Sequence, residues 1–197
     1  MKTDIDQILT AYTQNQSLQE KIVNLFYKVR DIPYGNINSR NAVDVFLHNK
    51  GTCSGKHQLL KQLYTRLGIP VKECLVMHKF NTLPVYFPKH IHKILHKINI
   101  VDPHNFLKIQ VDNKWITVDA TWDLYLEKFG FPVNKEWDGF TNMLVLVNAE
   151  SDVFETENSI ELKKELLSKI PDIIQTERKH FLSELTHWLD NERQKDA

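Results

Sequence analysis

The stretch that decides the fold is His104-Asn105-Phe106-Leu107-Lys108-Ile109-Gln110-Val111-Asp112-Asn113-Lys114-Trp115-Ile116-Thr117-Val118-Asp119-Ala120-Thr121-Trp122. Within it, two runs of alternating apolar and polar residues flank the pair Asp112-Asn113. Aspartate and asparagine tolerate the positive φ that a two-residue hairpin turn requires. The pattern therefore predicts a β-hairpin in which Val111 lies opposite Lys114.

His104 and Asp119 lie on one face of this predicted hairpin. Phe106 is opposite Asp119 in this register, which makes His104 a diagonal neighbour of Asp119 with Cα atoms roughly 7–8 Å apart. An imidazole and a carboxylate at that separation can share one hydrogen bond. A three-residue loop would instead place the two side chains on opposite faces, so the predicted site depends on the register. The other face predicts a core surface made of Leu107, Ile109, Val111, Ile116, Val118 and Ala120.

Cys53 opens a predicted helix that extends to about Leu67, and Gly68 is typical of the residue that follows the end of a helix. The first backbone N–H groups of a helix are unpaired and carry partial positive charge, which favours the reactive thiolate form of cysteine. A nucleophilic cysteine also needs a base and a group that orients the base. His104 and Asp119 can supply both.

The remaining elements indicate an α+β fold. Apolar residues at helical spacing predict helices near both ends of the chain, and short apolar runs predict further strands. The order of helices, then strands, then helices favours an antiparallel sheet. The length predicts a single domain over 1–197, with a core at about 31–148 and helical extensions at 1–30 and 160–195. The other predicted elements are a short helix capped by Ser39, strands at Val71–Met77 and Met143–Val147, a helical segment near His90–Ile98, and helices over Glu161–Arg193 with a break at Pro171.

Composition limits the class of protein. The chain has 197 residues, of which 42% are apolar and 25% are charged, as in an ordinary globular domain. Its formal net charge of zero argues against a globally basic nucleic-acid-binding protein. Two cysteines, Cys53 and Cys74, are too few for a disulfide scaffold and are typical of a reducing compartment. Because the sequence shows neither the apolar stretch of a signal peptide nor a run of about 18 apolar residues, we expect a cytoplasmic protein without a membrane span.

Residues 74–101 contain no aspartate or glutamate, although they hold several lysines and histidines. Such a segment is either a solvated surface or an attractant for an acidic substrate, an anionic lipid surface or nucleic acid. Its residues His90, His92 and His96 have a spacing that metal ligands can adopt on a helix. No cysteine or carboxylate lies close enough in the sequence to complete a site, so we predict no metal and no cofactor.

Taken together, these features resemble the transglutaminase-like domain of the papain-like cysteine enzyme superfamily. The resemblance runs from about Ile32 to Asp123. The family pattern is a glycine and a cysteine that open a helix, a histidine that begins a strand, and an aspartate at the end of the next strand. The chain departs from the pattern at Asn105, where a small residue is common, and at Phe106, where tryptophan is common. The matching segments are Asp31-Ile32-Pro33-Tyr34, Lys50-Gly51-Thr52-Cys53 with its helix, and the hairpin that starts at His104.

The resemblance implies a papain-like core in which the helix bearing the cysteine packs on an antiparallel sheet. It also implies a catalytic triad. Cys53 would be the nucleophile, His104 the general base and then the acid, and Asp119 the group that orients the imidazole. The implied reaction is acyl transfer through a thioester, with hydrolysis of an amide or peptide bond preferred over transfer to an amine. Zinc and calcium sites found in some branches are not expected, because paired CxxC motifs and an acidic cluster are absent from the sequence.

The expected substrate is a protein, a peptide or a small amide. Tyr34, Phe106, Trp115 and Trp122 are predicted to line its binding site. Tyr34 is also a candidate, by position, for the second donor of an oxyanion hole beside the backbone N–H of Cys53. The alternative function is a catalytically inactive binding module of the same fold, in which the basic segment 78–97 contacts an anionic partner. The sequence does not indicate the oligomeric state.

Overall fold

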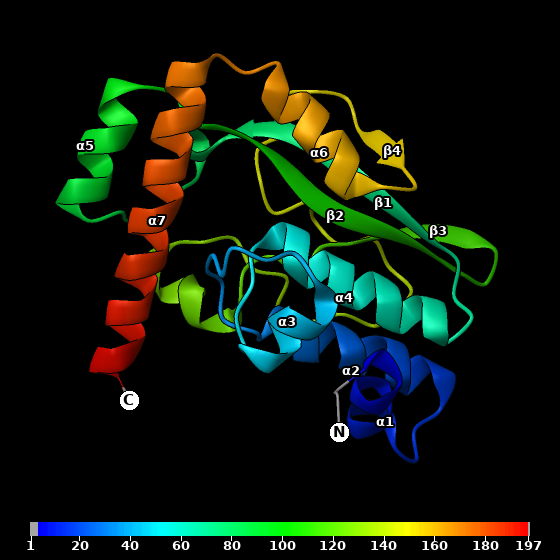
Figure 1. Ribbon diagram of the computed structural model, residues 1–197. Helices are drawn as coiled ribbons and strands as arrows, with labels where there is room; N and C mark the ends of the chain where they lie inside the picture. The colour runs from blue at the N-terminus through cyan, green and yellow to red at the C-terminus, as the bar shows by residue number, and fades with distance from the viewer. Residues whose placement is uncertain (1–3, 197) are drawn as a thin grey trace.

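The fold is a four-stranded antiparallel sheet covered by helices, as Figure 1 shows. The computed structural model describes residues 4–196. The strands are β1 (Val71–Lys79), β2 (Val101–Val111), β3 (Lys114–Val118) and β4 (Phe154–Thr156), in the spatial order β3-β2-β1-β4. The helices are α1 (Ile5–Thr13), α2 (Leu18–Arg30), α3 (Ala42–Leu47), α4 (Cys53–Arg66), α5 (Lys89–Lys97), α6 (Ser159–Ser168) and α7 (Asp172–Lys195), with short 3₁₀ helices at Phe80–Thr82 and Leu124–Phe129. These elements confirm the predicted α+β class.

Strands β2 and β3 form the predicted hairpin. Val111 pairs with Lys114 across the turn, and every further pair keeps that register. Asp112 and Asn113 have φ values of 49° and 62°, as the two central residues of a type I′ turn require. Because the two-residue turn fixes the register, it also fixes where His104 stands relative to the residues that follow β3.

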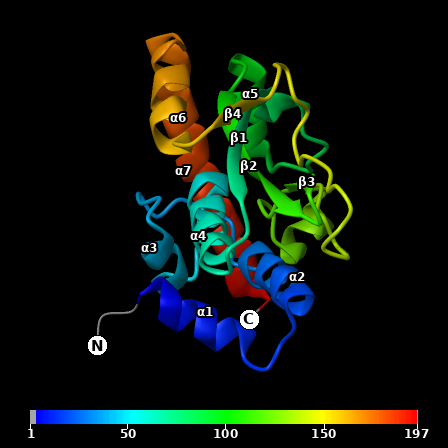
Figure 2. The same ribbon diagram turned by 90° about the vertical axis from the view of Figure 1, so that its right-hand side faces the viewer.

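Apolar cores lie on both sides of the sheet. Figure 2 shows α4 and α6 on one side and the long connection after β3 on the other. On the first side, apolar residues of α1, α2 and α4 pack on the predicted apolar face of the hairpin. On the second side, Cys74, Val76 and Phe106 pack with apolar residues of α5, α7 and the connection after β3. The sheet is therefore buried on both faces, and helix α4 is held firmly against it.

A buried lysine fixes the start of α4. The Nζ of Lys56 donates to the carbonyl oxygens of Arg30 at 2.8 Å, Ile32 at 2.9 Å and Thr121 at 2.7 Å. Burial lowers the pKa of Lys56 to about 8, so the ammonium remains charged at neutral pH. These three contacts tie the segment after α2 and the end of the hairpin to the first turns of α4.

The segment Met143–Val147 is not a strand, contrary to the prediction from its apolar run. The backbone N–H of Leu146 donates to the carboxylate of Asp119 at 2.9 Å, and the carbonyl oxygen of Leu144 accepts from the side chain of Asn134 at 3.0 Å. Side chains therefore satisfy backbone groups that a strand would pair in a ladder. The run is apolar because Leu146 and its neighbours pack in the core beside Trp122.

Two smaller differences concern helix and strand ends. Asn41, and not Ser39, caps α3, because its side-chain oxygen accepts from the backbone N–H of Val43 at 2.9 Å. The C-terminal helical region breaks before Pro171 as predicted. Strand β4 has only three residues and was not predicted. None of the helices within residues 4–196 has the length and apolarity that crossing a membrane would require.

Candidate active site

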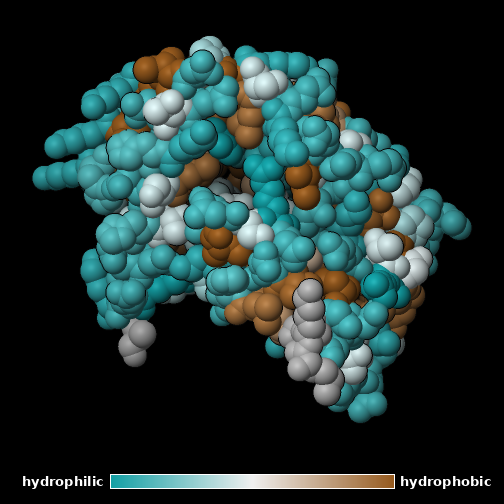
Figure 3. All heavy atoms as spheres, in the orientation of Figure 1, coloured by the Kyte–Doolittle hydropathy of each residue, from teal (hydrophilic) through white to brown (hydrophobic). Residues whose placement is uncertain are grey.

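Cys53 lies at the floor of a groove of about 980 Å³, with 4% of its surface exposed. One side of the groove is formed by α7, and the other by residues 34–40 and the first turn of α4. Figure 3 shows a hollow in the molecular surface in this region. The sulfur therefore lies below the surface but within reach of a bound molecule.

His104 and Asp119 meet beneath this groove. The Nε2 of His104 lies 2.7 Å from the Oδ2 of Asp119, which is fully buried. The carboxylate also accepts the backbone N–H groups of Thr121 at 3.1 Å and Leu146 at 2.9 Å. This bond leaves Nδ1 of His104 available to the thiol of Cys53, whose pKa His104 helps to lower. The hairpin therefore brings His104 and Asp119 together, and the start of α4 places Cys53 in the groove above them.

The charges at this site favour a thiolate and an imidazolium. Burial alone would raise the pKa of the Cys53 thiol, but the ammonium of Lys163 and the hydrogen bond with His104 outweigh burial and lower it to about 6. Burial alone would lower the pKa of His104, but the carboxylate of Asp119 raises it to about 10. The pKa of Asp119 is held well below its usual range, despite burial, by His104. Both members of the Cys53–His104 pair are therefore charged at neutral pH.

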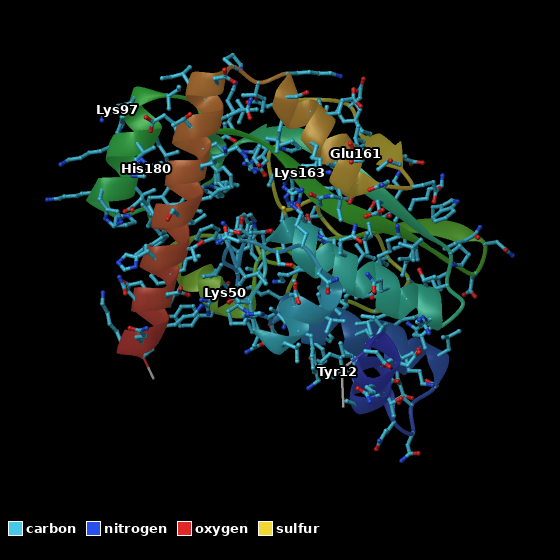
Figure 4. The ribbon with its side chains drawn as sticks, viewed as in Figure 1. Tyr12, Lys50, Lys97, Glu161, Lys163 and His180 are labelled. Carbon is cyan, nitrogen blue, oxygen red and sulfur yellow. The ribbon has the colours of Figure 1, made fainter. Side chains whose placement is uncertain are left out.

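Lys163 of α6 places a buried ammonium beside the thiol. Its Nζ lies 3.9 Å from the Sγ of Cys53 and 3.1 Å from the Oδ2 of Asp102, and it donates to the carbonyl oxygen of Pro103. Figure 4 shows Lys163 between α6 and α4. A positive charge shielded from water acts strongly on a neighbouring thiolate. The sequence analysis did not identify this residue, because one lysine on an amphipathic helix carries no local signal.

Asp102 holds that ammonium in place. Its carboxylate is buried between Lys163 and Arg178 of α7, whose guanidinium donates to Oδ1. Burial alone would raise the pKa of Asp102, but the charges of Arg178 and Lys163 keep it well below its usual range. Because a buried carboxylate is costly without such partners, this arrangement links the start of β2 firmly to both C-terminal helices.

His57 positions the start of α4 against the end of the hairpin. Its Nδ1 lies 2.8 Å from the carbonyl oxygen of Cys53, and its Nε2 accepts the backbone N–H of Ala120 at 3.0 Å. This pair of contacts requires a neutral ring with its proton on Nδ1. Burial lowers the pKa of His57 to about 4 and thus keeps the ring neutral.

The neutral state of His57 predicts a loss of stability in mild acid. The unfolded chain binds a proton at this histidine near pH 6.5, whereas the folded chain resists protonation until about pH 4. The free energy of unfolding should therefore fall as the pH drops through this range, by at most about 1.4 kcal/mol per pH unit for this group. Urea titrations at pH 7, 6 and 5 measure the slope. A His57→Gln variant should show a shallower slope, and an unchanged slope would contradict this role.

Tyr34 is the one predicted substrate-binding residue that lines the groove. Its backbone N–H donates to the Oδ2 of Asp123 at 2.8 Å, and its ring packs on Trp122 with centroids 4.4 Å apart. Trp122 is itself 1% exposed and donates its indole N–H to the carbonyl oxygen of Leu146, so it supports Tyr34 from the core.

Phe106 and Trp115 do not line the groove, contrary to the prediction. Phe106 is buried among apolar residues, with its ring stacked 6.5 Å from that of His104. Trp115 pairs with Gln110 near the turn of the hairpin, and its exposed ring lies 4.7 Å from the Nζ of Lys72. The two residues share the predicted face of the hairpin, but the hairpin is long, and the groove lies at the end far from the turn.

Other predicted features take no part in this groove. Within residues 4–196, no three histidine, cysteine or carboxylate side chains are arranged to hold a metal ion. Cys74 is buried, and burial raises the pKa of its thiol to about 11. The exposed side chains of α5 are all basic. Binding of an anionic partner by segment 78–97 stays a prediction.

No family model and no curated protein matches this chain. It is similar to the crystal structure of "a putative cysteine protease from Cytophaga hutchinsonii", with 14% identity, a TM-score of 0.43, and coverage of 78% of this chain and 48% of that one. It is also similar to the crystal structure of a TGase, with 16% identity, a TM-score of 0.43, and coverage of 62% and 32%. The chain thus spans half or less of these proteins, and likenesses this distant assign no function.

The order of the elements is the one that the sequence resemblance implies. A helix begins at Cys53, the following sheet carries His104 on β2, and Asp119 directly follows β3. Lys163 and Arg178 come from helices that follow this core in the sequence. They nevertheless contact Asp102 within it, so the C-terminal helices complete the site.

Proposed function

We propose that this protein is a cysteine enzyme that hydrolyses an amide or peptide bond through a thioester. One observation carries the proposal. The thiol of Cys53 lies at the floor of an open groove, and its pKa is lowered by Lys163 and by His104, whose Nε2 lies 2.7 Å from the carboxylate of Asp119. A nucleophile, a base and an orienting group in this order are the parts that covalent catalysis requires.

The proposed reaction has two steps. The thiolate of Cys53 attacks the carbonyl carbon of the amide. As the C–N bond breaks, the imidazolium of His104 gives its proton to the departing amine and a thioester remains. Neutral His104 then takes a proton from water as the water oxygen attacks the thioester, and the thiolate leaves with the release of a carboxylic acid. Asp119 keeps the imidazole oriented and stabilises its charged form in both steps.

Two groups can stabilise the oxyanion of the tetrahedral intermediates. The backbone N–H of Cys53 is at the start of α4, where no intrahelical acceptor is available. The phenol of Tyr34 is the second proposed donor, because Tyr34 lines the same groove beside Cys53. Hydrolysis is preferred over transfer to an amine because the groove is open to water.

The first test is the rate of Cys53 alkylation by iodoacetamide as a function of pH, in a Cys74→Ala background. We expect the rate to rise through a transition near pH 6, because the pKa of the thiol is lowered to about 6. In His104→Ala the transition should move to higher pH, because the hydrogen bond and the charge of the imidazolium are lost. A transition near pH 8.5 in the unsubstituted protein, or no reaction, would contradict the proposed enzyme and leave the inactive binding module.

Turnover is tested separately by the release of primary amines from a peptide mixture. Cys53→Ala is the control, since it removes the sulfur and leaves the groove. Amine release by the protein with intact Cys53 and none by the variant is the expected result. Equal release by both would show that Cys53 does not carry the reaction.

A further inference from the structure

The groove around Cys53 has an excess of positive charge. Arg40 lies on one side of it and Lys179 on the other. Within residues 4–196, neither side chain forms an ion pair with a carboxylate. The carboxylates that line the groove are already engaged: Asp190 is paired with Lys50 at 2.7 Å, and Asp102 is held between two cations.

The buried charges below the groove balance one another. Three cations, on Lys163, Arg178 and His104, face three anions, on Asp102, Asp119 and the thiolate of Cys53. Together these six groups add no net charge to the groove. The positive charges of Arg40 and Lys179 are therefore free to act on a bound molecule.

Both residues line the same groove as Cys53. The Cα of Arg40 lies 3.7 Å from where a Cβ would stand on Gly55, in the first turn of α4. Lys179 directly follows Arg178, whose guanidinium contacts Asp102 at the inner end of the groove. A chain bound along this groove would therefore meet a guanidinium on one side and an ammonium on the other.

We propose that the groove selects substrates with carboxylates next to the scissile amide, which means acidic peptides. This inference rests on the proposed function and names the substrate class for it. A guanidinium binds a carboxylate with paired hydrogen bonds, and a groove with charge of one sign raises the local concentration of ligands of the opposite sign.

The test compares two alkylating reagents of similar size, the anion iodoacetate and the neutral iodoacetamide. The ratio of their second-order rates at Cys53 is divided by the same ratio for N-acetylcysteine, which cancels the intrinsic difference between the reagents. We expect the corrected ratio, iodoacetate over iodoacetamide, to be about three or more in low salt. It should fall toward one in concentrated KCl as the charges are screened. The double variant Arg40→Ala, Lys179→Ala should lower the ratio toward one. Lys93→Ala removes an exposed lysine of α5 outside the groove and should leave the ratio unchanged.

The outcomes separate this inference from the proposed function. A corrected ratio near one, or a raised ratio that the double variant does not lower, would overturn the selection of acidic substrates even where the iodoacetamide transition remains near pH 6. Slow reaction with both reagents and an ordinary transition near pH 8.5 would overturn the proposed enzyme itself. Once turnover is measured, paired peptides that differ only by glutamate or glutamine beside the cleaved bond should be hydrolysed faster in the glutamate form, and equal rates would contradict the inference.

Discussion

Replacing Lys163 by methionine is expected to raise the pKa of the Cys53 thiol from about 6 toward the ordinary value of a cysteine. The ammonium 3.9 Å from the sulfur is the largest of the contributions that oppose burial, so its loss leaves burial to dominate. At pH 7 the alkylation rate should fall by about tenfold or more, because each unit of pKa above the pH removes about nine-tenths of the thiolate. Methionine fills a similar volume without a charge. The rate of iodoacetamide reaction against pH measures the shift.

The neighbouring residue provides the matched control for this variant. Lys164 is exposed and pairs with Glu161 on the surface of α6, so Lys164→Met removes the same charge from the same helix without approaching Cys53. In Lys164→Met, the transition in the rate of Cys53 alkylation should stay near pH 6. Circular dichroism shows whether Lys163→Met remains folded, as expected from the contact that Asp102 keeps with Arg178. A folded Lys163→Met variant with an unchanged transition would assign the low pKa to His104 alone.

Replacing Asp119 by asparagine is expected to lower both stability and reactivity. The carboxylate accepts from His104, Thr121 and Leu146, and an amide has one oxygen for these three donors. The NH₂ group of the asparagine must face N–H groups, which are also donors. The imidazolium of His104 also loses its counter-ion. Breaking a buried pair in this way costs about 3 kcal/mol or more, and in the serine triad the same change reduces turnover about 10⁴-fold.

Urea titration at pH 7 and the pH profile of alkylation measure the two effects of Asp119→Asn. The matched control is Asp123→Asn, because Asp123 is also a buried carboxylate, paired with Arg193 and bound to the N–H of Tyr34, but has no contact with His104. Asp123→Asn should have a lower free energy of unfolding and should keep the alkylation transition near pH 6. If Asp119→Asn also kept the transition near pH 6, the orienting role of Asp119 would be wrong.

The sequence predicted those parts of the molecule that local rules determine. The pair Asp112-Asn113 favours one kind of turn, and that turn fixes which residues face each other for the length of the hairpin. The position of His104 beside Asp119 follows from this register alone. The start of α4 at Cys53 and its end before Gly68 likewise follow from helix-end preferences.

Features that depend on contacts between distant segments could not be predicted in this way. Lys163 is 110 residues from Cys53, and only the docking of α6 brings the two together. The segment Met143–Val147 has the composition of a buried strand, and periodicity does not distinguish a strand from a buried loop whose backbone bonds to side chains. Trp115 was placed on the correct face of the hairpin but at the wrong end, because alternation determines the face and gives no distance from the groove.

The docking of α6 and α7 also determines when the thiol becomes reactive. Cys53 is made early during synthesis, whereas the residues that charge its surroundings, Lys163 and Arg178, leave the ribosome more than a hundred residues later. Domains generally fold as units, so a chain that holds α4 and the hairpin but has not yet docked α6 has a thiol that lacks the ammonium of Lys163.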